Sequence, residues 1–170
     1  QGLGTFDDAR QFARVKVVQA SGQVGLVLLG ASNQALVVAW NSGTLYIYWY
    51  LNGAQVGQLA IVSSTIHDGD EIEALLEQGT VYAKINGVVV TSVAKPTSLT
   101  FGTPGFETYQ AGAIFDNWEA GTSGPFTISG TITENAIGLS GVLVTASGGF
   151  SGSATTAGNG SYAITGVPFN

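Results

Sequence analysis

The residues with the clearest potential for chemistry are four carboxylates between positions 68 and 73. Retaining glycosidases cleave sugars with two carboxylates about 5 Å apart, and alternation along a strand would point Glu71 and Glu73 to the same side. The neighbouring Asp68-Gly69-Asp70, however, is typical of a turn that enters a strand. We therefore interpret all four carboxylates as part of a solvated turn and strand face, and we expect no catalytic residues and no enzyme activity.

Aromatic residues form a second pattern in the segment 44–51. Residues two apart in a strand share a face, so Tyr46, Tyr48 and Tyr50 would lie on one side, with the apolar residues between them in the core. Tyrosine rings can stack on a sugar, and their hydroxyls can hydrogen-bond to it. A tyrosine ladder can equally cover a sheet or pack on a neighbouring subunit. The three tyrosines are thus candidate carbohydrate-binding residues, with packing as the alternative.

The residue types that the chain lacks exclude several kinds of site. It has no cysteine, which excludes disulfides, thiolate nucleophiles, thiolate zinc sites and iron–sulfur clusters. Its single histidine, His67, excludes a multi-histidine metal site within one chain and disfavours a serine–histidine triad. Eleven acidic and five scattered basic residues give a net charge of −6. Nucleic acid and anionic membranes, which bind clustered Lys and Arg, are therefore not expected as partners.

Hydropathy and charge content bear on where the protein works. Only 9% of the residues are charged, against about a quarter in an average soluble domain. The mean hydropathy is +0.30, yet no apolar run approaches the roughly 18 residues of a membrane-spanning helix, so no membrane insertion is expected. A sulfur-free, charge-poor sequence rich in Gly, Ser, Thr and Val is typical of an extracellular, cell-surface or virion-surface protein.

Local patterns predict an all-β, antiparallel protein. Alternating and β-branched segments recur, separated by Gly and Asn about every ten residues, and helical periodicity is lacking. The pairs Asn52-Gly53 and Asn86-Gly87 favour type I′ hairpin turns. The strands expected in the first part of the chain are Phe12–Gln19, Gln23–Leu29, Ala35–Trp40, Thr44–Leu51, Gln55–Ile61, Glu71–Glu77, Thr80–Ile85, Val88–Val93 and Ala113–Glu119.

A change in composition near Gly121 predicts two domains. Residues 121–125 are small and turn-forming, and no charged residue occurs from Asn135 to Asn170. We place a first domain at 1–120, a linker at 121–125 and a partial second domain at 126–170. About 45 residues are near the lower limit for an unstapled fold, so we expect this domain to be cut short or completed by a partner. Its expected strands are Thr127–Thr133, Val142–Ser147, Gly152–Thr156 and Ser161–Thr165.

Four segments of the first domain together resemble a known family. They are Gly69–Ala74, Val81–Val88, Gly102–Phe106 and Phe115–Glu119. In this order they resemble the latter half of bacterial and phage jelly rolls of the concanavalin A-like lectin/glucanase superfamily, of the laminin-G-like kind, and Asp8–Val15 resembles a middle strand of that fold. The resemblance implies an antiparallel jelly-roll β-sandwich whose first strands precede Gln1, with a glycan on its concave sheet. The glucanase pattern E-x-D-x-x-E is absent, in keeping with a non-catalytic protein.

The same resemblance bears on metal binding. Lectin-like jelly rolls often hold a structural Ca²⁺, which needs six to eight oxygen ligands, and Asp116 occupies the position of one ligand in related modules. Asp7 and Asp8 would be further ligands. The alternative is that Asp116 caps a turn or pairs with a nearby Lys or Arg. No other cofactor is expected.

The second domain is similar to carboxypeptidase-regulatory-like, immunoglobulin-type modules, through Ile128–Ile132, Gly138–Val144 and Gly158–Ile164. It would be a partial immunoglobulin-like β-sandwich, truncated after Pro168.

Two functions follow from the whole sequence. The first is a non-catalytic extracellular or virion-surface recognition or adhesion module that binds glycan. The second is a structural subunit of a phage particle, as a tail fibre or head decoration, or of an extracellular filament. There, self-association or a neighbouring subunit would engage residues 126–170, because an incomplete sandwich exposes a strand edge.

Overall fold

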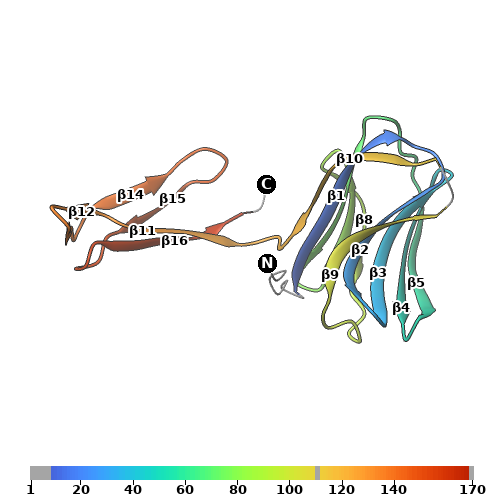
Figure 1. The fold of residues 1–170 in the computed structure, drawn as a ribbon, viewed down its shortest axis with the longest axis horizontal. Coiled ribbons are helices and arrows are strands. Elements are labelled where there is room, and N and C mark those ends of the chain that lie inside the picture. The colour runs from blue at the N-terminus through green and yellow to red at the C-terminus, as the bar shows by residue number, and fades with distance from the viewer. Residues whose placement is uncertain (1–8, 110–111, 169–170) are drawn as a thin grey trace. The chain divides into compact units, whose positions relative to one another are not determined.

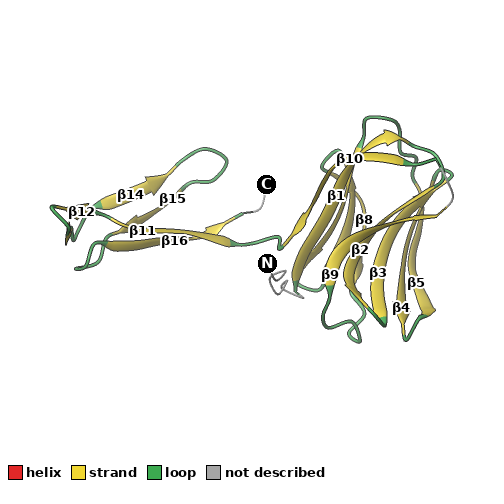
Figure 2. Ribbon diagram, viewed as in Figure 1, coloured by secondary structure: helices red, strands yellow, loops and turns green. Residues whose placement is uncertain are grey.

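A computed structural model describes residues 9–109 and 112–168, and every regular element in them is a β-strand (Figures 1 and 2). The same residues contain no helix that is long and apolar enough to cross a lipid bilayer. The chain divides into two compact units, Gln1–Ser123 and Gly124–Asn170. All-β, antiparallel architecture is therefore confirmed.

Two five-stranded antiparallel sheets form the first unit. One has the order β10-β1-β6-β7-β8, with strands β1 (Arg10–Gln19), β6 (Glu71–Glu77), β7 (Thr80–Ile85), β8 (Val88–Ala94) and β10 (Ile114–Gly121). The other has the order β5-β4-β3-β2-β9, with strands β2 (Gln23–Ala31), β3 (Gln34–Asn41), β4 (Thr44–Leu51), β5 (Ala54–Ser63) and β9 (Thr103–Tyr109).

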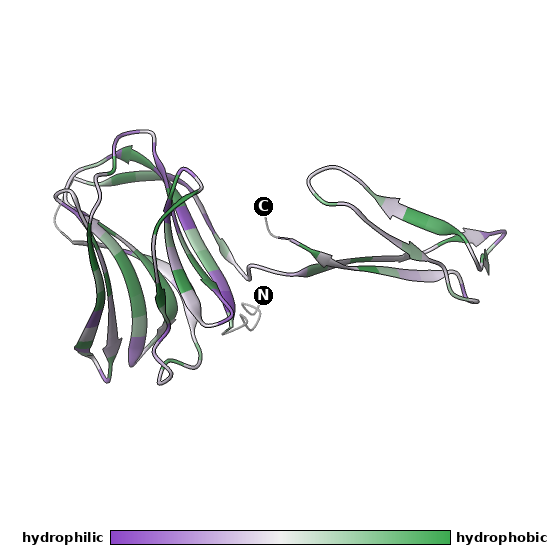
Figure 3. Cartoon of the chain, turned by 180° about the vertical axis from the view of Figure 1, so that it is seen from behind, coloured by the Kyte–Doolittle hydropathy of each residue, from purple (hydrophilic) through white to green (hydrophobic). Residues whose placement is uncertain are grey.

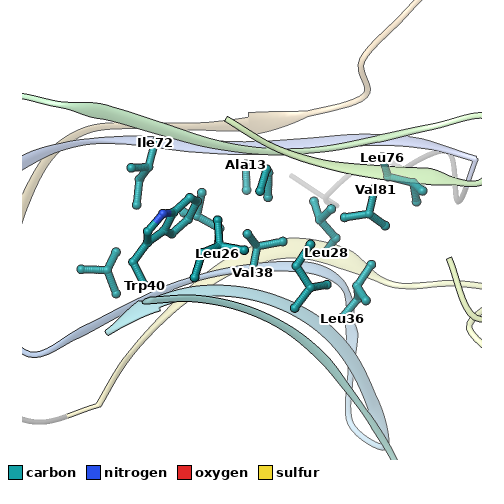
Figure 4. Packing of buried hydrophobic residues seen from close by; sticks show 14 of the residues in the cluster. Ala13, Leu26, Leu28, Leu36, Val38, Trp40, Ile72, Leu76 and Val81 are labelled. Atoms are coloured by element: carbon teal, nitrogen blue, oxygen red, sulfur yellow. The ribbon is translucent and has the colours of Figure 1, made fainter. Parts of the chain in front are cut away.

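The two sheets face each other across one apolar core. Alternation along each strand directs every second side chain inward, and Figure 4 shows Ala13, Ile72 and Leu76 of one sheet meeting Leu26 and other residues of the opposite sheet. Burying one such Leu, Ile or Val side chain stabilises a fold by about 1.5–3 kcal/mol. Figure 3 shows apolar residues, in green, along the strands of both sheets.

Tight turns connect neighbouring strands in both sheets. The two residues of each Asn-Gly pair have positive φ, at 54° and 77° for Asn52-Gly53 and at 50° and 77° for Asn86-Gly87, as a type I′ turn requires. The β3–β4 and β6–β7 connections have the same geometry, with φ values of 48° and 80° at Ser42-Gly43 and at Gln78-Gly79. These turns fix the register that places alternate residues on opposite faces.

Strand β9 is absent from the strands that the sequence analysis expected, although Gly102–Phe106 was one of the segments that carried the resemblance. Residues from Thr103 onward form a strand that pairs with β2, with Phe106 opposite Leu26. Pro104 lacks a backbone N–H, which normally excludes proline from the interior of a sheet. Because β9 is the last strand of its sheet, one side of it needs no ladder partner, and the proline is tolerated there.

A buried amide links the two sheets. The side chain of Gln11 on β1 is fully buried; its Nε2 donates to the carbonyl of Gly102 at 2.9 Å, and its Oε1 accepts from the N–H of Leu29 at 3.0 Å. Leu29 lies at an irregularity of β2 and has a φ of 52°. Gln11 therefore supplies partners to backbone groups that the ladder leaves free, and it anchors β2 and the start of β9 to the opposite sheet.

The second unit consists of three two-stranded antiparallel sheets. They pair β11 (Phe126–Thr131) with β16 (Ser161–Val167), β12 (Thr133–Glu134) with β13 (Ile137–Gly138), and β14 (Leu143–Ala146) with β15 (Gly152–Thr155). The four strands expected here are present, and the short β12–β13 hairpin is additional. Among the described apolar side chains of this unit larger than alanine, Ile164 alone is buried. The likeness to an immunoglobulin-type module stays a prediction.

Candidate functional site

The tyrosines of β4 lie on the outer face of the β5-β4-β3-β2-β9 sheet. Leu45 and Ile47 are fully buried in the core, so Tyr46, Tyr48 and Tyr50 point away from it, and all three are partly buried. The rings of Tyr48 and Tyr50 meet edge to face, with centroids 5.7 Å apart. The alternation expected from the sequence is therefore present in the structure.

Small residues next to the tyrosines make the surface hollow. In the register of the sheet, Ala39 lies opposite Tyr46 and Val37 opposite Tyr48, while Gly25 on β2 lies opposite Ala39. Val37 and Ala39 are fully buried although they do not belong to the core cluster. Larger side chains of the outer face must therefore cover them, so the small residues of the central strands form a floor beneath those side chains and are not themselves exposed.

A hydrogen-bonded group of three polar residues spans this floor. The Tyr48 hydroxyl donates to Glu107 Oε1 at 2.6 Å, and Gln23 Nε2 lies 3.0 Å from the Tyr48 hydroxyl and 3.4 Å from the same carboxylate oxygen. Tyr48 is on β4 and Glu107 on β9, and β3 and β2 separate them, a span of roughly 14 Å at the usual strand spacing. The two side chains meet because both lie across the small residues of the intervening strands.

Glycine at position 25 makes room for Glu107. A Cβ atom added to Gly25 would come within 2.4 Å of Glu107 Cγ, closer than any real contact of this kind. Since Gly25 and Glu107 are directly opposite each other in the β2–β9 ladder, any larger residue at position 25 would move the Glu107 side chain off Tyr48. The glycine thus positions the carboxylate.

The surroundings of Tyr48 raise the pKa of its hydroxyl. Partial burial is the main cause, and the hydrogen bond to Glu107 and the negative charge of that carboxylate act in the same direction. Each of these disfavours the phenolate. Tyr48 therefore keeps its proton at neutral pH and is fixed as the donor, with Glu107 as the acceptor.

The result is an open groove of about 450 Å³, a volume within the range of small-molecule and sugar sites. Its lining combines phenol rings, carboxamides, a hydroxyl and one carboxylate. The lining residues are Gln23, Asn41, Tyr46, Tyr48, Tyr50, Gln55, Gln58, Glu107 and Thr108. Aromatic faces next to carboxamide and carboxylate groups can stack on an apolar ring face and hydrogen-bond to hydroxyls around its edge.

Sequence reasoning identified the tyrosines but missed the other residues of the groove. Gln23, Asn41, Gln55 and Gln58 are ordinary strand residues whose common location depends on the pairing of four strands. Glu107 was missed because no strand was expected between Val93 and Ala113. The sequence did contain a signal that could have identified Glu107, because it is the one charged residue in all five strands of this sheet.

The carboxylates considered for hydrolysis have structural partners. Asp68 Oδ1 accepts from the N–H of Ala20 at 2.7 Å, and Asp70 accepts from Asn86 Nδ2 and from the N–H of His67, each at 2.8 Å. These contacts hold two loops beside β6. The groups lie away from the groove, which none of them lines.

Glu73 belongs to a row of charges on the outer face of the β10-β1-β6-β7-β8 sheet. Its carboxylate lies 2.6 Å from Lys84 Nζ and 3.9 Å from Arg14 Nη1, and Arg14 in turn contacts Glu119 at 2.5 Å. These residues face one another directly across four strands. Glu71 on the same strand is exposed, as the sequence predicted, whereas Glu73 is buried beneath its two cations and does not belong to a solvated face.

Asp116 lies beside a second, apolar hollow of about 330 Å³. The rings of Phe106, Phe115 and Trp118 form its main wall, with Phe106 5.2 Å from Trp118 and 6.4 Å from Phe115 between centroids. Asp116 lies within β10, opposite Lys16 in the β1–β10 ladder, and its Oδ1 accepts from the N–H of Asn117 at 2.8 Å.

The calcium site itself stays a prediction. Within residues 9–109 and 112–168, no three His, Cys, Asp or Glu side chains are grouped so that they could hold a metal ion. Asp7 and Asp8, the other expected ligands, lie outside the described residues.

Comparison with known proteins establishes the fold of the first unit. Neither protein-family models nor curated protein sequences match this chain. Among solved structures, the carbohydrate-binding module CBM66 from Bacillus subtilis matches with a TM-score of 0.57 at 12% identity, over 70% of this chain and 76% of the module. Sheep galectin-11, solved in complex with glycerol, matches with a TM-score of 0.53 at 7% identity, over 66% of this chain and 89% of the galectin.

A second galectin gives the same result. Caenorhabditis elegans galectin LEC-6 matches with a TM-score of 0.53 at 11% identity, over 71% of this chain and 87% of the galectin. These proteins share a jelly-roll β-sandwich of the lectin type, and the expected jelly-roll fold is confirmed. At such low identity the likeness extends to the fold alone.

Proposed function

We propose that the first unit is a non-catalytic carbohydrate-binding domain whose glycan lies in the tyrosine groove of the β5-β4-β3-β2-β9 sheet. The observation that carries the proposal is the groove itself, in which Tyr46, Tyr48 and Tyr50 adjoin a carboxylate and four carboxamides. The fold is shared with a carbohydrate-binding module and with galectins, which supports this assignment. The absence of the glucanase pattern and the structural roles of the carboxylates near β6 support a function without catalysis.

A glycan-array experiment with three single variants tests this proposal. Tyr46→Ala and Tyr50→Ala each remove a groove ring and leave the Tyr48–Glu107 hydrogen bond in place. Truncating an aromatic side chain that anchors a ligand costs about 1–3 kcal/mol in binding, a roughly five- to hundredfold loss of affinity. Tyr82→Ala is the matched control, because Tyr82 lies on β7 in the other sheet. Equal loss of binding in all three variants, or none in any of them, would contradict the proposal.

We also propose the setting that the sequence predicts, outside the cell, on a cell surface or on a virion. The charge-poor composition without cysteine supports it. The pairing of Arg14 and Lys84 with carboxylates is consistent with the expectation that nucleic acid is not a partner.

A second candidate function, assembly through the second unit, is favoured by a separate observation. Phe126, Ile128, Ile137 and Leu143 are all exposed, to 44%, 42%, 71% and 65%. Each described strand of this unit is ladder-paired with only one other strand, so strand edges are available for β-augmentation. Together these features fit a subunit of a particle or filament whose residues 126–170 contact a copy of the chain or a neighbouring subunit.

Light scattering over a range of concentrations tests assembly. The chain should form dimers or larger species that Ile137→Asn and Leu143→Asn weaken. Val88→Asn replaces an equally exposed apolar residue of the first unit and should have no effect. A chain that stays monomeric at every concentration would count against assembly and leave the glycan proposal untouched.

A further inference from the structure

We infer that Glu107 makes the tyrosine groove selective for glycans without acidic groups, so that uronate-bearing sugars are excluded. The inference rests on the proposed function, because it concerns which glycans the same groove accepts. The glycans that the groove accepts would be uncharged sugars with free hydroxyls, and Glu107 would be the residue that sets this preference.

The first argument is the charge of the groove. Glu107 is the one charged residue among the groove's lining residues, which otherwise carry amides, phenols and a hydroxyl. None of the ion pairs between described residues involves Glu107. A carboxylate on a ligand would therefore meet an uncompensated negative charge at close range, in partly desolvated surroundings where such repulsion is strong.

The second argument is the orientation of the carboxylate. Both hydrogen bonds to Glu107, from Tyr48 and from Gln23, go to Oε1. In the described residues no group donates a hydrogen bond to Oε2, which keeps its full acceptor capacity. A carboxylate oxygen accepts hydrogen bonds from hydroxyl groups and has nothing to donate. A sugar hydroxyl satisfies Oε2, whereas a deprotonated sugar acid offers it another acceptor.

The third argument is that the carboxylate is held in place. Gly25 beneath it and Tyr48 beside it fix its position over the floor of the groove. A mobile surface glutamate could swing away from an acidic ligand, but moving Glu107 would break the hydrogen bond to Tyr48. An acidic ligand would therefore meet this repulsion whenever it occupied the groove. A free amino group on the sugar would not be repelled by Glu107.

The experiment compares matched ligands. The probes are soluble β-glucan, galactan and mannan, each before and after oxidation of its primary hydroxyls to carboxylates. For the wild-type chain, the best neutral probe should bind roughly ten- to hundredfold more tightly than its oxidised form, and the ratio should shrink as salt is added, because ions screen the repulsion. Glu107→Gln should reduce the ratio to within about threefold, with oxidised probe gaining affinity.

The control is Glu119→Gln, which removes one negative charge from the other sheet, where Glu119 pairs with Arg14. It should leave the ratio unchanged, which separates a local effect of Glu107 from an effect of net charge. Oxidised probe that binds the wild type as tightly as neutral probe, or a ratio that Glu107→Gln leaves unchanged, would overturn the inference while neutral binding persists. Failure of every neutral probe to bind would instead overturn the proposed function, and the inference with it.

Discussion

The two outer faces of the sandwich carry polar groups in opposite ways. On the β10-β1-β6-β7-β8 sheet, Glu119, Arg14, Glu73 and Lys84 alternate in sign across four strands, and each charge contacts its neighbour. On the β5-β4-β3-β2-β9 sheet a single carboxylate lies among tyrosines and amides. The first face satisfies its own charges, whereas the second keeps hydrogen-bonding capacity and ring surface available to a ligand.

This difference depends on side-chain size as well as on charge. Long side chains lie opposite one another on the charged face, and they fill the surface of the sheet. The other sheet has glycine, alanine and valine at Gly25, Ala39 and Val37 of its central strands, flanked by the tyrosines of β4 and by Glu107 of β9. Because the central residues are small, the surface is hollow there. Polar side chains from the neighbouring strands reach across the small residues and meet above them.

Among variants that test the difference between the two faces, Gly25→Val should have the largest effect, because it should remove the hollow. The new side chain would displace Glu107, since even a Cβ at this position would lie 2.4 Å from Glu107 Cγ. We expect glycan affinity to fall at least tenfold and the free energy of unfolding to fall by about 1–2 kcal/mol, because a hydrogen bond to a charged acceptor is lost. Calorimetry of binding and urea unfolding measure the two effects. Unchanged glycan affinity would show that the hollow is not the binding site.

The second-largest effect is expected from Lys84→Met, a variant of the charged face. Glu73 would lose its closest cation while its side chain stays only 10% exposed, and Arg14 at 3.9 Å compensates in part. We expect the free energy of unfolding to fall by about 1–2 kcal/mol, with glycan affinity within twofold of wild type. A large change in affinity would contradict the separation of the two faces.

The smallest effect is expected from Tyr48→Phe, which removes one hydroxyl from the groove. The free energy of unfolding should fall by about 0.5–1.5 kcal/mol at neutral pH, since Glu107 keeps Gln23 as a donor. Because the pKa of Tyr48 is raised in the folded state, this stabilisation is fully present below the unfolded pKa of about 10. It is lost as the pH rises from there through the folded pKa.

Ultraviolet titration provides the direct check. The folded wild-type chain should show an ionisation step well above the ordinary tyrosine pKa of about 10, from Tyr48, and the Tyr48→Phe variant should lack that late step. A wild-type chain without such a late step would contradict the partly buried, carboxylate-bound hydroxyl.

The sequence allowed most of the strands and the tyrosine face to be predicted, because both depend on local rules, but it did not predict β9. Alternation located Tyr46, Tyr48 and Tyr50 opposite Leu45 and Ile47, and positive-φ glycine turns fixed the hairpins. Glu107 could not be assigned to the groove in this way. It contacts Tyr48 across 59 residues of sequence, and it does so through a strand whose proline is tolerated only because the strand lies at a sheet edge.

The second unit also shows that local sequence rules do not determine long-range contacts. Its main strands follow from local alternation, yet their pairing leaves Ile137 and Leu143 exposed. Local sequence rules specify strands, but they do not specify what covers them. The likeness of this unit to an immunoglobulin-type module therefore stays a prediction, and its assembly with a partner is the proposal that the light-scattering experiment tests.

The most direct test of the account is a nuclear magnetic resonance titration of the ¹⁵N-labelled chain with the best neutral glycan from the array. The account predicts that the largest chemical-shift changes fall on the backbone amides of Tyr46, Tyr48, Tyr50 and Glu107, with little change at Arg14 and Lys84 on the opposite sheet. Changes centred on the charged face, or on Phe106 and Trp118 at the apolar hollow without the tyrosines, would contradict it.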